Sequence, residues 1–162
     1  MTLKSSFPPA AAPDARLLIV GSLPGQRSLA EQRYYAHPQN QFWRLLSPVV
    51  GRPLPTLAYE ARLRVLQGRG IALWDVVATA RRMGSADAAI RDAEPNDLAA
   101  LVRSLPDLRA VAFNGGMAAK IGRPLLAAEA VTLVDLPSSS PLHTVGLPAK
   151  QAAWSALADH LA

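Results

Sequence analysis

The residues best suited to chemistry gather in one ten-residue segment, YYAHPQNQFW (34–43). It holds four aromatic rings, a histidine, a proline, an asparagine and two glutamines in an otherwise alanine- and leucine-rich chain. Pro38 pushes His37 away from helical dihedrals. We therefore expect the rings to flank a loop that leads into a helix beginning near Asn40.

Four further segments carry small or polar residues: GSLPG (21–25), WDV (74–76), FNGG (113–116) and LPSSSP (136–141). Three of the four are rich in small or turn-forming residues, which let a ligand approach the backbone. Each of the four segments ends a short apolar run. They are the expected places for a binding or catalytic site.

Several familiar chemistries fit these segments poorly. A serine hydrolase needs G-x-S-x-G, whereas GSLPG places its serine one position early and a proline at the turn. A phosphate-binding loop needs a lysine followed by serine or threonine after its glycines, and neither this motif nor a dinucleotide fingerprint occurs. Asp75 is the only acid expected at the site, which disfavours a glycosidase that works through two carboxylates. The chain has no cysteine and three scattered histidines, so no metal site and no iron–sulfur cluster are predicted.

Four nearly continuous apolar runs must position these segments. They span 15–22, 70–77, 108–115 and 130–137, and such runs are typical of parallel strands covered on both faces. Ligands of open parallel sheets bind at the carboxyl ends of the strands, where the polar segments lie. The pattern of strands and helices predicts a three-layer α/β/α sandwich with a four-stranded parallel sheet.

Helices are expected between these runs. Ser28 and Glu31 fit a capping box at the start of one short helix. Further helices are predicted over 40–50, over 56–67, from a cap at Asn96 to Pro106, over 115–126, and from the first turn at Pro148 through Leu161.

Composition predicts one domain over 17–162, preceded by a flexible, proline- and alanine-rich arm over 1–16. No signal peptide or membrane span is apparent, so a cytoplasmic protein is expected, with a monomer as the default. The net charge of +5 and a pI near 10.2 favour a polyanionic partner.

The order of several motifs resembles one known family. GSLPGQRS, QRYYAHPQNQFW, LWDVV, MGSADAAI, PNDL, FNGG and LPSSSP follow one another as in the hypoxanthine-DNA glycosylase (DNA-deoxyinosine glycosylase) branch of the uracil-DNA glycosylase superfamily. The resemblance implies the same α/β/α sandwich and hydrolysis of the N-glycosidic bond of a deaminated base, hypoxanthine or uracil, in base excision repair. The implied partner is DNA containing such a base, and no cofactor is expected. The four cysteines of the iron–sulfur branches are absent.

The resemblance also implies roles for individual residues. Asn40 is the essential polar, catalytic residue of this branch. Leu23 stands where mismatch-specific relatives have an asparagine that handles the attacking water, and leucine cannot form hydrogen bonds through its side chain. Leu142 and His143 replace the asparagine and alanine of the branch, and Leu142 could act as the wedge that fills the vacated stack. The expected base pocket comprises Gly21, Ser22, Leu23, Pro24, Gly25, Tyr35, Phe42, Asp75 and Asn114. The expected DNA contacts are Arg27, Ser138, Ser139, Ser140, Leu142, His143 and Lys150.

Ordinary structural roles compete with these assignments. Asn40 could be a helix N-cap, and at least two of the four aromatic residues, above all Trp43, could pack in the core. His37 fits a polar loop residue or a phosphate contact better than a general base. Arg81 and Arg82 are expected on a solvated surface. The alternative functions are a uracil or mismatch-specific glycosylase, a DNA-binding module without catalysis, and a small α/β hydrolase acting on esters.

Overall fold

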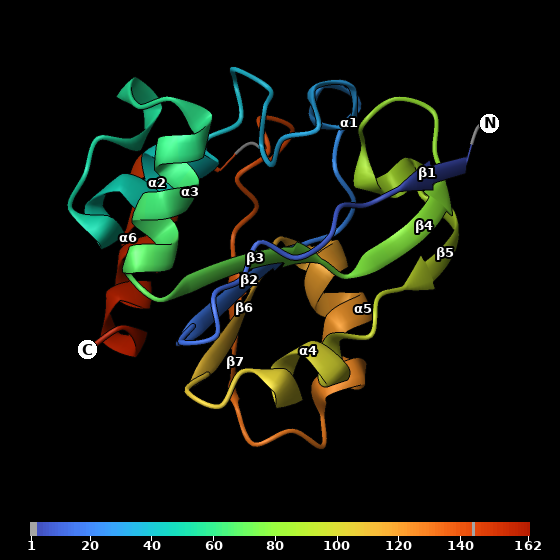
Figure 1. Cartoon of the computed structure of the whole chain (residues 1–162). Coiled ribbons are helices and arrows are strands. Elements are labelled where there is room, and N and C mark those ends of the chain that lie inside the picture. Colours follow the sequence, from blue (N-terminus) through green and yellow to red (C-terminus); the bar gives the residue numbers. More distant parts are fainter. Residues whose placement is uncertain (1–2, 144) are drawn as a thin grey trace.

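A parallel sheet of four strands forms the centre of the molecule (Figure 1). The structure is a computed structural model that describes residues 3–143 and 145–162. The strand order is β3-β2-β6-β7, with β2 (Leu17–Gly21), β3 (Ile71–Asp75), β6 (Ala110–Asn114) and β7 (Thr132–Leu136). Each strand lies inside one of the four predicted apolar runs. Both β2 and β6 are buried along their whole length, which explains why their sequences do not alternate.

Helices cover both faces of this sheet. Leu17 and Ile19 face one core cluster beneath α2 (Phe42–Val50), α3 (Tyr59–Gly68) and α6 (Leu147–Ser155). Leu18 and Val20 face the other cluster, beneath α4 (Leu98–Ser104) and α5 (Gly116–Leu126). The predicted three-layer sandwich is confirmed. None of the helices in the described residues is long and apolar enough to cross a bilayer.

A second sheet, which the sequence pattern did not predict, lies beside the first. It is antiparallel, in the order β1-β4-β5, and consists of β1 (Leu3–Ser5), β4 (Val77–Arg81) and β5 (Arg91–Pro95). One residue, Val76, separates β3 from β4, so the chain runs from the parallel sheet directly into the antiparallel one. The sequence pattern gave no sign of this change of sheet, because residues 70–77 form one continuous apolar run.

The start of the chain is not a loose arm, which corrects that expectation for residues 3–16. β1 pairs with β4, and Ala10 forms a bridge to Leu73 of the central sheet. The Trp74 indole donates to the Phe7 carbonyl at 2.9 Å, and the Tyr34 hydroxyl donates to the Pro8 carbonyl at 2.8 Å. Prolines fix an extended backbone and lack a donor, so they suit a segment at the edge of a sheet.

Two predicted helix starts are wrong in detail. Ser28 lies inside α1 (Gln26–Glu31) and accepts from the Ala36 N–H at 3.0 Å, so it does not form a capping box. Asp97, and not Asn96, caps α4 by accepting from the Ala100 N–H at 3.0 Å. The remaining predicted helices are present with shifted ends. The first turn of α6 holds a proline, as predicted for Pro148.

Short 3₁₀ turns complete the described elements, at Leu54–Thr56, Asp87–Ala89 and Ala156–His160. The turn at Asp87–Ala89 belongs to the connection between β4 and β5. That connection reaches the carboxyl edge of the parallel sheet, where Ser85 and Asp87 line a cavity.

Candidate active site

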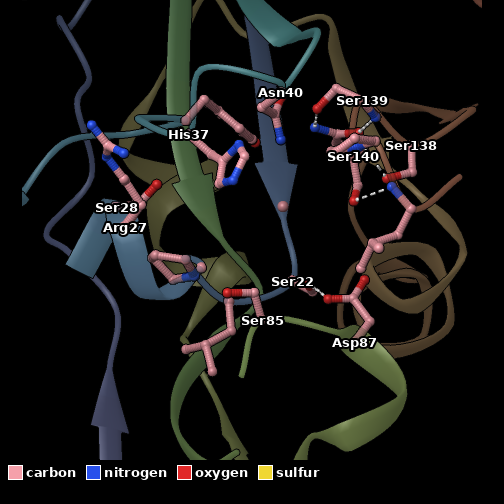
Figure 2. Close-up of a pocket in the computed structure, with 18 of the residues that line it drawn as sticks. Ser22, Arg27, Ser28, His37, Asn40, Ser85, Asp87, Ser138, Ser139 and Ser140 are labelled. Atoms are coloured by element: carbon pink, nitrogen blue, oxygen red, sulfur yellow. Dashed lines mark hydrogen bonds between the residues drawn. The ribbon is translucent and has the colours of Figure 1, made fainter. Parts of the chain in front are cut away.

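A cavity of about 870 Å³ lies at the carboxyl ends of β2, β3 and β6, which is the edge predicted from the strand pattern (Figure 2). This volume is typical of a site that encloses a small ligand. The structure brings together nearly all predicted site residues. Of the base-pocket, catalytic and DNA-binding residues proposed from the sequence, every one except Phe42 and Lys150 lines the cavity.

Asn40 lies where the aromatic loop meets α2. Its Oδ1 accepts from the Phe42 N–H, at the first residue of α2, at 2.9 Å, whereas the N-cap position itself belongs to Gln41. Its Nδ2 has no hydrogen-bond partner among residues 3–143 and 145–162, and Figure 2 shows this nitrogen directed into the cavity. The bond to Phe42 holds the amide in one orientation. The free N–H group is thereby presented to whatever enters the cavity.

The four rings of the aromatic segment divide between wall and core. Tyr35 lines the cavity and stacks on Phe42, with ring centroids 3.8 Å apart and planes 10° from parallel. Phe42 is fully buried behind Tyr35, which corrects its predicted place in the base pocket. Trp43 is also core, as expected, and its indole donates to the Tyr35 carbonyl at 3.2 Å. Tyr35 has φ 53°, a left-handed conformation that bulky residues rarely adopt, so this packing holds it against backbone strain.

Gly21, Tyr35 and Asp75 form the floor of the cavity. A Cβ added to Gly21 would lie 2.9 Å from Asp75 Oδ1 and 3.0 Å from Tyr35 Oη, so only glycine fits there. Two buried side-chain atoms of this floor, Tyr35 Oη and Asp75 Oδ2, have no hydrogen-bond partner within the described part of the chain. Buried polar atoms without partners are costly, and both of these belong to residues that line the cavity.

Burial sets the ionisation of both floor groups. The pKa of Asp75 is raised from 3.8 to about 7, first by loss of solvent and then by the nearby Asp87, while Arg82 acts in the opposite direction. Burial also raises the pKa of Tyr35 well above its ordinary value, so its hydroxyl stays neutral. At neutral pH the Asp75 carboxyl is therefore divided between a neutral form, which can donate, and an ionised form, which only accepts.

Arg82 supports the GSLPG loop by hydrogen bonds to backbone carbonyls. Its guanidinium donates to the carbonyls of Leu23, Pro24 and Gly84, and the residue is only 1% exposed. The expected solvated surface at this position is therefore wrong, because three carbonyls replace the water that an arginine normally keeps. Ser22 is tied to the same region by donating to Asp87 Oδ1 at 2.6 Å.

Asn114 fastens the loop after β7. It accepts from the Ser139 N–H and donates to Ser139 Oγ, both at 2.9 Å, and both residues are buried. The neighbouring hydroxyls of Ser138 and Ser140 accept from N–H groups of the same loop. Asn114 thus lines the cavity and holds this wall in place through its oxygen and one N–H.

A sequence model of the uracil DNA glycosylase superfamily matches residues 8–158. The chain belongs to this superfamily. Two curated relatives, both named hypoxanthine DNA glycosylase, are each 37% identical to it. The protein from Methanosarcina acetivorans aligns over 98% of this chain and 99% of its own length, and that from Methanosarcina barkeri over 94% and 96%. A solution NMR structure described as a candidate uracil DNA glycosylase of M. acetivorans superposes with a TM-score of 0.89, at 38% identity and 99% coverage of both chains.

The predicted DNA contacts of this superfamily member separate into exposed and buried residues. Leu142 is 67% exposed, and Arg27 and His143 are exposed at the cavity rim. Arg27 pairs with Glu31 at 2.6 Å, a surface contact weak enough to exchange for a phosphate. Lys150 is fully buried, so its predicted contact with the DNA backbone is wrong.

Sequence reasoning did not assign some of the residues that line this cavity. Ser28, Ser85 and Asp87 line it, as does His37, whose Nδ1 accepts from the Gln39 N–H at 3.1 Å. Ser85 and Asp87 belong to the motif MGSADAAI, which carried the family resemblance but lies in an irregular connection far from any predicted strand end. That motif was the one available signal for these two residues. In the described residues no group of three or more histidine, aspartate or glutamate side chains could hold a metal ion.

Proposed function

We propose that this chain is a monofunctional DNA glycosylase that releases hypoxanthine, with uracil as a second substrate, from DNA. It would act as a monomer in the cytoplasm and leave an abasic sugar. The observation that carries the proposal is the free Nδ2 group of Asn40, whose amide is held by the Phe42 N–H in a cavity lined by Tyr35. The two relatives named hypoxanthine DNA glycosylase, similar over nearly the whole chain, support the choice of base.

The target nucleotide must leave the helix before it can reach this cavity. Extrusion costs a few kcal/mol and costs less for a mispaired base. Leu142, which protrudes at the rim, is suited to fill the gap left in the stack. The exposed Arg27 and His143 and the half-buried Ser138 and Ser140 are suited to phosphate contacts, which position DNA without reading its sequence. The predicted contact at Ser139 is not proposed, because this residue is buried and bound to Asn114.

Inside the cavity, the exposed face of Tyr35 would stack on the base, a contact worth roughly 1–3 kcal/mol. The Asp75 carboxyl at the cavity floor would pair with its polar edge. Hypoxanthine and uracil present the same order of ring N–H and carbonyl oxygen. The same floor can therefore pair with either base.

Bond breakage leaves positive charge on the sugar and negative charge on the departing base. The Asn40 N–H either stabilises that base or orients the water that attacks the sugar carbon. A preorganised donor of this kind contributes about 3–4 kcal/mol in other enzymes. No basic catalyst is required, because water can capture a sugar cation that has already largely formed.

The test uses duplexes that contain one hypoxanthine, one uracil or only normal bases, scored by alkali-labile strand breaks. Breaks at hypoxanthine are expected, with weaker breaks at uracil. Cleavage of the uracil duplex alone would overturn the choice of base. Binding of all damaged duplexes without any base release would instead favour a module without catalysis.

Two substitutions test the role of Asn40. Asn40→Asp keeps the oxygen that accepts from the Phe42 N–H and removes the N–H that faces the cavity. Asn40→Ala removes both, and loss of the bond to Phe42 costs about 1 kcal/mol of stability. We expect both variants to release base at least 100-fold more slowly, while only Asn40→Ala is destabilised. An Asn40→Asp protein with normal base release would remove Asn40 from its proposed role.

A further inference from the structure

Lys150 is the one fully buried lysine of the described chain, and all of its N–H groups are occupied. Its Nζ donates to Gln41 Oε1 at 2.8 Å, to the His143 carbonyl at 3.0 Å and to the Ser140 carbonyl at 3.3 Å. An ammonium group has three N–H bonds, so none remains for a phosphate. The residue predicted to contact DNA must act in some other way.

The three acceptors belong to two separate walls of the cavity. Ser140 and His143 lie in the loop after β7, whereas Gln41 directly follows Asn40. A second bond joins the same walls, because the Gln41 N–H donates to the Ser139 carbonyl at 2.9 Å. The residue next to Asn40 is therefore held through both its side chain and its backbone.

Burying a positive charge in order to join two loops is unfavourable in free energy. Within the described residues Lys150 forms no ion pair with an acidic group, and burial lowers the pKa of its ammonium. Buried charges often stabilise a fold less than apolar residues of the same size would. They do specify geometry, because charge-assisted hydrogen bonds are short and directional.

We propose that Lys150 is a positioning residue for base release: it fixes the Asn40 segment against the loop that carries Leu142. This inference rests on the proposed function. Lys150 touches neither base nor sugar. It acts by keeping Gln41, and with it the Asn40 amide, at one distance from the wall that meets the DNA.

Lys150→Met, which keeps the length of the stem and removes the ammonium, tests the proposal. The readout is the single-turnover rate of hypoxanthine release, measured in the wild-type and in the Asn40→Ala backgrounds. We expect at least a ten-fold loss in the wild-type background and less than a two-fold loss in the Asn40→Ala background. A merely structural lysine would lower both rates by the same factor, and that result would overturn the proposal, as would an unchanged rate in the wild-type background.

A second pair of variants covers the case in which Lys150→Met does not fold. Gln41→Leu removes the acceptor from a half-buried side chain and is expected to slow release at least five-fold. Its matched control is Gln151→Leu. Gln151 joins α6 to the Leu45 carbonyl at 3.0 Å without touching either wall, so release should be unchanged. Equal effects of the two glutamine variants would overturn the proposal.

The same measurements separate this inference from the function on which it rests. A wild-type protein that releases neither base overturns both. Base release that depends on Asn40 but not on Lys150 or Gln41 leaves the proposed function standing and removes only the positioning role.

Discussion

Replacing Asp75 by asparagine should change how the stability of the fold depends on pH. The folded chain keeps the Asp75 proton up to a pKa of about 7, whereas the unfolded chain loses it near the ordinary value of 3.8. Between these values the folded state binds more protons than the unfolded state. Stability therefore falls as pH rises from about 4 to about 7, and this contribution is constant above that range.

The size of the effect follows from the two pKa values. Each pKa unit corresponds to about 1.36 kcal/mol, so the full loss is about 4 kcal/mol. Somewhat less than half of it has already occurred at about pH 5. A further loss of about 2–3 kcal/mol is therefore expected between about pH 5 and about pH 8.5.

Urea denaturation of the wild type and of Asp75→Asn at these two pH values measures this quantity. Asparagine does not titrate. The free energy of unfolding of the variant, relative to that of the wild type, should therefore rise by about 2–3 kcal/mol between the lower and the higher pH. Other carboxylates contribute equally to both proteins and cancel. Asp159→Asn, at an exposed position, is the control and should show no such gain. If wild type and Asp75→Asn keep a constant difference within about 0.5 kcal/mol, Asp75 does not titrate as its burial requires.

Three further predictions concern the walls of the cavity. Gly21→Ala should lower stability by about 1–3 kcal/mol and abolish base release, because the added methyl group overlaps the cavity floor. Denaturation measures the first effect and a release assay the second. Arg82→Met should lower stability by about 2 kcal/mol or more, since it leaves three carbonyls without their donor, and should slow base release; a well-folded variant with normal release would contradict the bracing role. Leu142→Ala should slow release from a paired duplex on the order of ten-fold and leave release from single-stranded DNA unchanged, because only the duplex needs a wedge; equal losses on both substrates would refute this.

The parallel sheet was predictable because β2, β3 and β6 are almost wholly buried, and such strands have unbroken apolar sequences. The edge strand β7 is partly exposed but lies in a similar apolar run. The carboxyl ends of these strands indicate where the site lies. The antiparallel sheet was not predictable in the same way. β5 (Arg91–Pro95) is exposed along its whole length, and β4 is the continuation of an apolar run that already predicted one strand. Neither strand carries the alternation of a half-buried strand.

Individual side chains were predictable where residue type and position restricted their role. Asn40 was assigned from the family resemblance, since the pattern of the aromatic segment alone favours a helix cap; its bond to the Phe42 N–H and its unpartnered Nδ2 needed coordinates. Arg82 and Lys150 were misplaced for the same reason: their charge predicts solvent, and only the carbonyls that surround them make burial possible. The sequence does not show which carbonyls converge on one point, because this depends on the tertiary structure.

The pairing of β1 with β4 has a practical consequence for recombinant work. The first residues look dispensable by composition and would be an obvious place to shorten the gene or attach an affinity tag. Yet Leu3–Ser5 pair with β4, the strand that leads to Arg82. The Pro8 carbonyl also accepts a hydrogen bond from the hydroxyl of Tyr34, which precedes Tyr35. A deletion of residues 3–8 would therefore remove contacts that support two sides of the cavity at once.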